Sequence, residues 1–129
     1  MVVYVMIKGI GVDIVEVDRI QKALVRYGDR FAQKILSVSE YGEYQVAIMK
    51  AAFVAKRFAM KEAFVKALGT GMRDGIFFTD IAVTHDALGK PFIEVGSSFQ
   101  HWILGNDVHV SVSDEKNTVV AFVVIEHRP

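Results

Sequence analysis

The sequence predicts one α+β domain over residues 1–129. Candidate helices gather in the first half of the chain, and candidate hairpins lie in the second half. This partial segregation favours an α+β fold over a doubly wound sheet, in which strands and helices alternate. The longest helix is expected within 50–71, because this Ala-rich run has no helix breaker before Gly69 and ends in a Gly-Thr-Gly stop signal.

The elements before this helix are expected to be one strand and three helical segments. In chain order these are a strand over 2–10 entering a turn at 9–11, an extended segment over 12–15, a helix over 16–27, a helical turn over 31–35 and a short helix from Ser37 or Ser39 to Tyr44. β-Branched residues indicate a buried strand, and Gly28 ends the first helix. Ser37 and Glu40 have the spacing of a capping box.

The elements after the long helix are expected to be two hairpins and a short helix. In chain order they are a loop over 71–75, strands over 77–84 and 91–95 joined by a turn at 86–90, a short helix capped by Ser97 or Ser98 and ending at Leu104, and strands over 109–113 and 118–125 around a turn at 114–117. β-Branched runs bounded by Gly, Asp and Asn favour this assignment.

The composition excludes several classes of protein. The net charge is zero, which argues against a general nucleic-acid binder, and the absence of cysteine excludes disulfides and thiolate metal sites. The hydrophobic share is 52%. A chain this small has little interior for so much apolar surface, so we expect part of it to meet another subunit.

The N-terminal apolar run is not typical of a targeting segment. Residues 1–7 lack a basic lead and are not followed by a cleavage-like segment. No run approaches the roughly 20 apolar residues that span a bilayer. We therefore expect a cytoplasmic protein without membrane or nucleic-acid partners.

The charges of the long helix are distributed unusually. Arg57 and Lys61 share one side, while Glu62 and Lys66 form an (i, i+4) pair about 140° away. An ordinary surface helix gathers its charges on one face. The Glu62–Lys66 pair therefore either caps a core as a plain ion pair or lines a site.

Asp13 at a strand end provides a second carboxylate. The Gly9–Gly11 spacing there does not complete a dinucleotide fingerprint, because Ile14 occupies the third glycine position. Asp13 could be a turn or cap residue. Paired with Glu62, in a chain whose histidines lack zinc-site spacing, it suits a hard cation such as Mg²⁺ completed by substrate phosphates. Lys66 could then hold a phosphate oxygen.

Two further patterns leave a functional and a structural interpretation open. The first is a basic series at steps of three or four: Arg19, Lys22, Arg26, Arg30 and Lys34. It is either a solvated face or a dock for an acidic helix or phosphate-rich partner. The second is a polar strand face formed by His109, Ser111 and Ser113, which either borders a cleft or is simply exposed.

Five segments together resemble the holo-acyl-carrier-protein synthases, the small bacterial class of 4′-phosphopantetheinyl transferases. They are residues 9–16 (GIGVDIVE), 31–40 (FAQKILSVSE), 53–71 (FVAKRFAMKEAFVKALGTG), 88–91 (LGKP) and 109–114 (HVSVSD). The core within 58–67, F-x-x-KE-A-x-x-KA, is highly specific in combination with the early G-x-D. The resemblance covers nearly the whole chain.

The resemblance implies a fold, an assembly and a reaction. The fold is one long central helix packed on a mostly antiparallel sheet, and the assembly is a homotrimer with each active site between two subunits. The reaction is Mg²⁺-dependent transfer of 4′-phosphopantetheine from coenzyme A to a serine of apo acyl carrier protein, in fatty acid biosynthesis. A non-catalytic subunit that binds coenzyme A and kept the fold is the alternative.

The resemblance also implies roles for individual residues. Asp13 and Glu62 would ligate Mg²⁺, and Lys66 would contact phosphate. On chemical grounds the serine also needs a base within hydrogen-bond reach, for which Glu62 is the first candidate and Asp114 the second. The residues implied in substrate binding are Arg19, Lys22, Arg26, Arg57, Lys61 and Ser113. Of these, Arg57 and Lys61 would lie near the coenzyme or the subunit boundary. Many relatives have His where this chain has Asp114, so any role of that histidine does not carry over.

Overall fold

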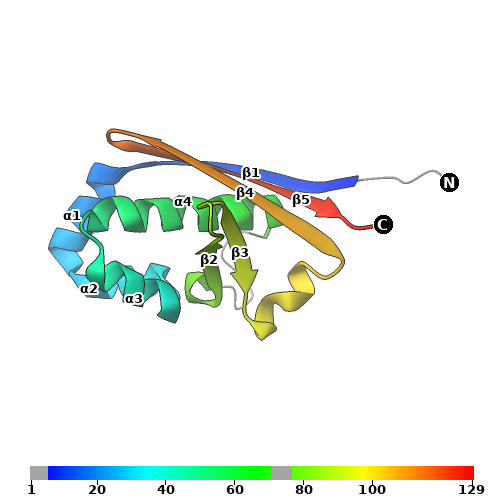
Figure 1. Cartoon of the computed structure of the whole chain (residues 1–129), viewed down its shortest axis with the longest axis horizontal. Helices are drawn as coiled ribbons and strands as arrows, with labels where there is room; N and C mark the ends of the chain where they lie inside the picture. Colours follow the sequence, from blue (N-terminus) through cyan, green and yellow to red (C-terminus); the bar gives the residue numbers. More distant parts are fainter. Residues whose placement is uncertain (1–5, 71–76) are drawn as a thin grey trace.

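The computed structural model describes residues 6–70 and 77–129 (Figure 1). Its elements are β1 (Met6–Glu16), α1 (Val17–Tyr27), α2 (Asp29–Ile35), α3 (Val38–Val46), α4 (Lys50–Leu68), the 3₁₀ turn η1 (Phe78–Asp80), β2 (Ile81–His85), β3 (Pro91–Val95), the 3₁₀ turn η2 (Ser97–Trp102), β4 (Asn106–Glu115) and β5 (Thr118–His127). The predicted loop over 71–75 and the start of the predicted first strand lie outside the described residues.

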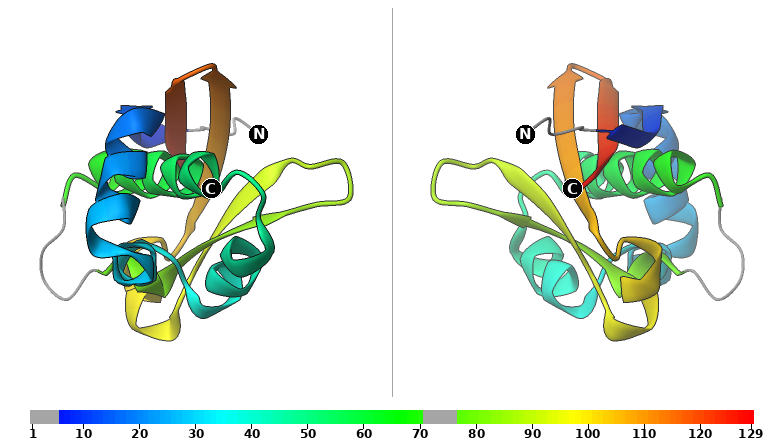
Figure 2. Two further views of the ribbon diagram at one scale, coloured as in Figure 1. Left: turned by 90° about the vertical axis from the view of Figure 1, so that its left-hand side faces the viewer. Right: turned by 90° about the vertical axis from the view of Figure 1, so that its right-hand side faces the viewer.

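The long helix packs on an antiparallel sheet, which confirms the predicted α+β class. The sheet has the order β1-β5-β4, and α4 lies along one of its faces (Figure 1). Helices α1 to α3 gather at one end of α4. The β2–β3 hairpin forms a separate two-stranded sheet and extends away from the layer of α4 and the larger sheet (Figure 2).

The predicted turn at 9–11 is wrong, because β1 runs through it as a continuous strand with one irregularity between Ile7 and Gly9. The glycines serve close packing instead. A Cβ on Gly9 would lie 1.9 Å from the carbonyl oxygen of Ala67, and one on Gly11 would lie 2.0 Å from that of Ala63. Only glycine allows this approach of strand and helix backbones.

The helix boundaries follow local signals closely. Gly28 has a φ of 65° and donates its N–H to Leu24 O after α1. The Ser37–Glu40 capping box is present at the start of α3, as predicted. Helix α4 ends at Leu68, and Gly69 caps it in the left-handed region with a φ of 79°.

The C-terminal half differs from prediction in two places. The strand expected from residue 77 begins only at Ile81, because Phe78–Asp80 forms a 3₁₀ turn. The helix expected after Gly96 is the 3₁₀ turn η2, which has no side-chain cap. The hairpin of β4 and β5 is confirmed and is longer than predicted.

One face of the sheet is covered and the other is open. The core lies between α4, the inner sheet face and β2, with Phe64, Ile81 and Val123 among its most buried members. On the outer sheet face Ile14 is 68% exposed and Phe122 is 45% exposed. No helix of the described residues is long and apolar enough to cross a membrane.

Candidate active site

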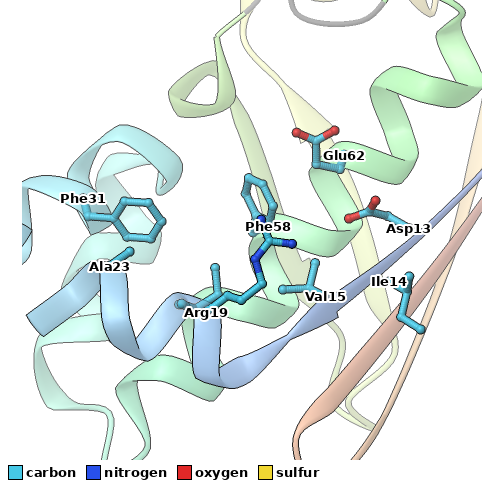
Figure 3. A pocket seen from close by; sticks show the side chains of 9 residues that line it. Asp13, Ile14, Val15, Arg19, Ala23, Phe31, Phe58 and Glu62 are labelled. Carbon is cyan, nitrogen blue, oxygen red and sulfur yellow. The ribbon is translucent and has the colours of Figure 1, made fainter. Parts of the chain in front are cut away.

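A cavity of about 430 Å³ lies where β1, α1, α2 and α4 meet (Figure 3). Its lining residues are Asp13, Ile14, Val15, Arg19, Ile20, Ala23, Phe31, Phe58 and Glu62. Two carboxylates and one guanidinium thus surround an otherwise apolar hollow. The cavity includes the two carboxylates that the sequence predicts as metal ligands.

Asp13 and Glu62 come from facing elements. Asp13 alternates with Gly11 on β1 and therefore shares the strand face that packs on α4, where Glu62 resides. Burial raises the pKa of the Glu62 carboxyl, and the charge of Asp13 raises it further, while Lys66 opposes the shift. Two carboxylates that repel each other in a half-buried site favour the approach of a cation.

Lys66 supplies a positive charge to this pair from the next turn of α4. Its Nζ lies 2.8 Å from Asp13 Oδ1 and donates a second hydrogen bond to Val12 O at 3.0 Å. The plain Glu62–Lys66 helix pair left open by the sequence is not formed. Instead Lys66 binds across to β1.

The two carboxylates suit a Mg²⁺ ion that is completed by waters and substrate phosphates, rather than one held by protein ligands alone. No group of three or more His, Asp or Glu side chains within residues 6–70 and 77–129 could hold a metal ion. Mg²⁺ is usually bound by one or two carboxylates together with waters and substrate phosphates. Asp13 and Glu62 match that pattern, with Lys66 beside them.

The apolar walls of the cavity were missed from the sequence. Phe31 on α2 and Phe58 on α4 enclose it, and Arg19 extends from α1 toward Phe58 (Figure 3). The rings of Phe58 and Phe78 pack in a T-shaped arrangement with 5.7 Å between their centroids. The aromatic spacing in the sequence carried no signal, because each wall comes from a different element.

The basic series of α1 and α2 divides between two hollows and the surface. Arg19 lines the active-site cavity, whereas a second hollow of about 610 Å³ is formed by Arg26, Tyr27, Arg30, Phe31 and Lys34. Lys22 is exposed on α1 and lines neither. The aromatic component, with the Arg26 guanidinium 5.2 Å from the Tyr27 ring, was not predicted.

Arg57 and Lys61 do not line this cavity, so their predicted substrate contact is not made there. The Lys61 side chain is 0% exposed and pairs with Glu40, which is 1% exposed. Burial lowers the pKa of the Lys61 amine, and the Glu40 charge opposes that shift. Arg57 is also buried and pairs with Glu40 and Glu43. Both side chains are part of the core.

Ser113 and Asp114 lie apart from the cavity within one chain. They line a hollow of about 420 Å³ at the β4–β5 hairpin, and Asp114 pairs with Lys56 at 3.6 Å. Ser113 is in register with Val120, which in turn faces Ile14 on the outer side of the sheet. The predicted contact of Ser113 with substrate therefore cannot be made to the cavity of its own chain.

Comparison with known proteins gives a consistent family. The model of the 4′-phosphopantetheinyl transferase superfamily matches residues 9–123. A holo-[acyl-carrier-protein] synthase of Nitrosomonas europaea is 48% identical over 124 residues, which cover 94% of this chain and 99% of the relative.

Two solved structures have the same fold. The holo-[acyl-carrier-protein] synthase of Neisseria meningitidis superposes with a TM-score of 0.88 at 46% identity, covering 93% of this chain and 98% of that one. The synthase of Bacillus anthracis, in complex with coenzyme A (3′,5′-ADP), gives 0.80 at 40% identity, covering 95% and 98%. Together with the carboxylate pair in its cavity, these matches show that the chain belongs to the holo-[acyl-carrier-protein] synthases of the 4′-phosphopantetheinyl transferase superfamily.

Proposed function

We propose that this protein transfers 4′-phosphopantetheine from coenzyme A to a serine of apo acyl carrier protein, as part of fatty acid biosynthesis. The observation that carries the proposal is the pair of Asp13 and Glu62 in a largely apolar cavity, with Lys66 bonded to Asp13. With a divalent cation on the two carboxylates, such a set can bind and neutralise phosphate oxygens. A non-catalytic subunit that binds coenzyme A would not require all three groups.

The reaction exchanges one phosphorus–oxygen bond for another. The serine oxygen bonds to the β-phosphorus of coenzyme A, the bond from that phosphorus to the bridging oxygen breaks, and adenosine 3′,5′-bisphosphate leaves with the electron pair. Asp13 and Glu62 would hold a Mg²⁺ ion, which would supply positive charge near the pyrophosphate oxygens. Lys66 adds a point charge to the same oxygens, as charge builds on them in the transition state.

The serine proton must pass to a base within hydrogen-bond reach, directly or through water. Glu62 is the first candidate, because its carboxylate lines the cavity. Asp114 is the second candidate. It could take part only from a neighbouring copy, since it lines a different hollow in its own chain.

The hollow between α1 and α2 is the proposed carrier dock. Arg26, Arg30 and Lys34 converge there with two aromatic rings, and Arg19 continues the positive charge into the active-site cavity. Lys22 lies exposed on the same helix. An acidic helix of the carrier could bind these groups and direct its serine toward Glu62.

A homotrimer is the proposed assembly. The outer sheet face exposes Ile10 at 60%, Val12 at 54% and Ile14 at 68%, which is an unusual concentration of apolar side chains on a monomer surface. Covering this face by a second copy would also bring Ser113 toward another subunit. A Phe122→Glu change should reduce the mass measured by light scattering from trimer to monomer.

Mass spectrometry tests the proposed transfer. The protein is mixed with coenzyme A, Mg²⁺ and apo acyl carrier protein, and the carrier is weighed. We expect the added mass of phosphopantetheine on the carrier, and none when Mg²⁺ is removed by a chelator. Binding of coenzyme A without any modified carrier would favour the non-catalytic alternative.

A further inference from the structure

A buried ionic cluster lies on a different side of α4 from the cavity residues and consists of Glu40, Arg57 and Lys61. Lys61 Nζ lies 2.5 Å from Glu40 Oε1, and Arg57 Nε lies 3.4 Å from Glu40 Oε2. All three side chains are less than 10% exposed. The cluster contains no member of the cavity lining.

Lys61 connects three elements through one ammonium group. Besides Glu40 it donates to Ile35 O at 2.7 Å and to Phe78 O at 3.0 Å. A lysine ammonium has three hydrogens to donate, so every one is used. The end of α2, the start of α3 and the turn η1 are thereby fixed to α4.

Glu40 connects two more backbone segments. Its Oε1 accepts the N–H of Ser37 at 2.8 Å, and its Oε2 accepts the N–H of Val83 at 3.1 Å. The carboxylate thus holds the N-terminus of α3 and the strand β2 at the same point. These directional contacts leave few alternative arrangements for the groups that meet there.

The cluster sets the orientation of the cavity side chains on α4. Arg57 and Lys61 each immediately precede a cavity residue, Phe58 and Glu62, about 100° further around the helix. Binding one side of α4 therefore determines where the other side points. The contact to Ile35 O also fixes the end of α2, the helix that carries Phe31.

Stability alone does not explain charges at this position, because well-packed apolar residues can replace a buried ion pair without loss of stability. We propose that Glu40 is a positioning residue for the transfer reaction, acting through Lys61 to hold Glu62 in its metal-binding direction. The proposal rests on the metal role proposed for Glu62. Glu40 itself does not contact substrate.

Two variants test the proposal. The double change Glu40→Leu with Lys61→Met removes the charges of the Glu40–Lys61 pair at similar volume and leaves Arg57 paired with Glu43. Glu40→Gln removes the negative charge and keeps one oxygen to accept from Ser37 and Lys61, but its amide group cannot accept from Val83. For each, kcat is normalised to the folded fraction from circular dichroism, and Mn²⁺ affinity without coenzyme A is measured by electron paramagnetic resonance. We expect about tenfold lower kcat and about tenfold weaker Mn²⁺ binding, with the KM for the carrier within twofold.

Controls separate positioning from other effects. Arg128→Met breaks the exposed pair with Asp107 and should leave kcat and Mn²⁺ affinity unchanged. Normal kcat and Mn²⁺ affinity per folded molecule in both cluster variants would overturn the proposal. Failure of both variants to fold would also overturn it, because the cluster would then serve stability alone. Glu62→Gln separates failure of the positioning role from failure of the metal role. If this variant keeps Mn²⁺ binding and transfer, the metal role proposed for Glu62 is wrong.

Discussion

Lys66 Nζ and Asp13 Oδ1 lie 2.8 Å apart and join α4 to β1 beside the second carboxylate, Glu62. The ammonium pairs with one of the two carboxylates proposed to bind a metal ion. A cation in this position reduces the repulsion between the two carboxylates. The Lys66 ammonium must also compete with a divalent ion for the Asp13 carboxylate.

Replacing Lys66 by Met should strengthen metal binding in the absence of coenzyme A. Removing one positive charge at this distance is expected to increase Mn²⁺ affinity about three- to tenfold, since Lys66 is half exposed and solvent screens its field. The same variant should lose most transfer activity, because the phosphate contact is gone. Titration followed by electron paramagnetic resonance measures the affinity.

Lys56→Met is the matched control, since Lys56 lies on the same helix but pairs with Asp114. Its Mn²⁺ affinity should equal that of the wild type. Unchanged or weaker binding by the Lys66 variant would show that the ammonium does not compete with the metal.

Replacing Glu62 by Gln should abolish transfer and raise the stability of the metal-free protein at pH 7. The pKa of Glu62 is raised in the folded state, so the folded protein binds the proton more tightly than the unfolded chain. The resulting stability is present below the unfolded pKa and is lost as the pH rises through the folded pKa. The amide avoids that loss, and we expect a melting temperature about 1–4 °C higher.

The difference between the two proteins should shrink toward pH 4, where Glu62 is protonated in the wild type as well. Calorimetry in a chelating buffer over pH 4–8 measures it. A lower melting temperature of the variant at pH 7 would indicate that the carboxylate forms a stabilising pair and contradict this account.

Replacing Arg19 by Glu should raise the KM for the carrier about tenfold and change the KM for coenzyme A much less. Arg19 lies at the edge of the active-site cavity on α1, beside the basic hollow. Steady-state kinetics with each substrate varied in turn measures both constants. Arg128→Glu makes the same charge reversal elsewhere, and equal effects of Arg19→Glu on both constants would argue against a docking role.

Replacing Gly11 by Ala should destabilise the fold by about 2–3 kcal/mol or more, because the new methyl would meet the Ala63 carbonyl at 2.0 Å. Gly42→Ala is the control within a helix: its Cβ meets nothing within 4 Å, and it should stabilise by up to about 1 kcal/mol. Urea unfolding compares them. A Gly11 variant as stable as the wild type would mean that β1 can move away from α4.

Local signals predicted the elements well where the determining contacts are local. The capping box of Ser37 and Glu40 and the stop at Gly69 involve neighbours within a few residues, and both appear in the structure. The Gly9 to Gly11 segment was misassigned because its constraint is the approach of a helix more than 50 residues later. A glycine pattern alone does not distinguish a turn from close packing.

The candidate site was likewise predicted where the signal is local and missed where the determining contact is distant in the sequence. Asp13, Glu62 and Lys66 were singled out because carboxylates at a strand end and on a largely apolar helix are chemically unusual. The resemblance implied a substrate contact for Lys61, and nothing in the sequence indicated its partner, Glu40, which lies 21 residues away. The capping role and the core ion pair use the same carboxylate, and only the packing of α3 against α4 shows the second.

The contact of β1 with α4 determines more than stability. Two residues of a strand rise roughly 6.6 Å, and four residues of a helix rise roughly 6.0 Å. The contacts Gly9–Ala67 and Gly11–Ala63 therefore repeat at nearly the same spacing along β1 and along α4. A slip of either element would place a side chain where only a hydrogen fits. The distance between the elements that carry Asp13 and Glu62 is therefore established when the chain folds, and ligand binding needs to rearrange side chains alone.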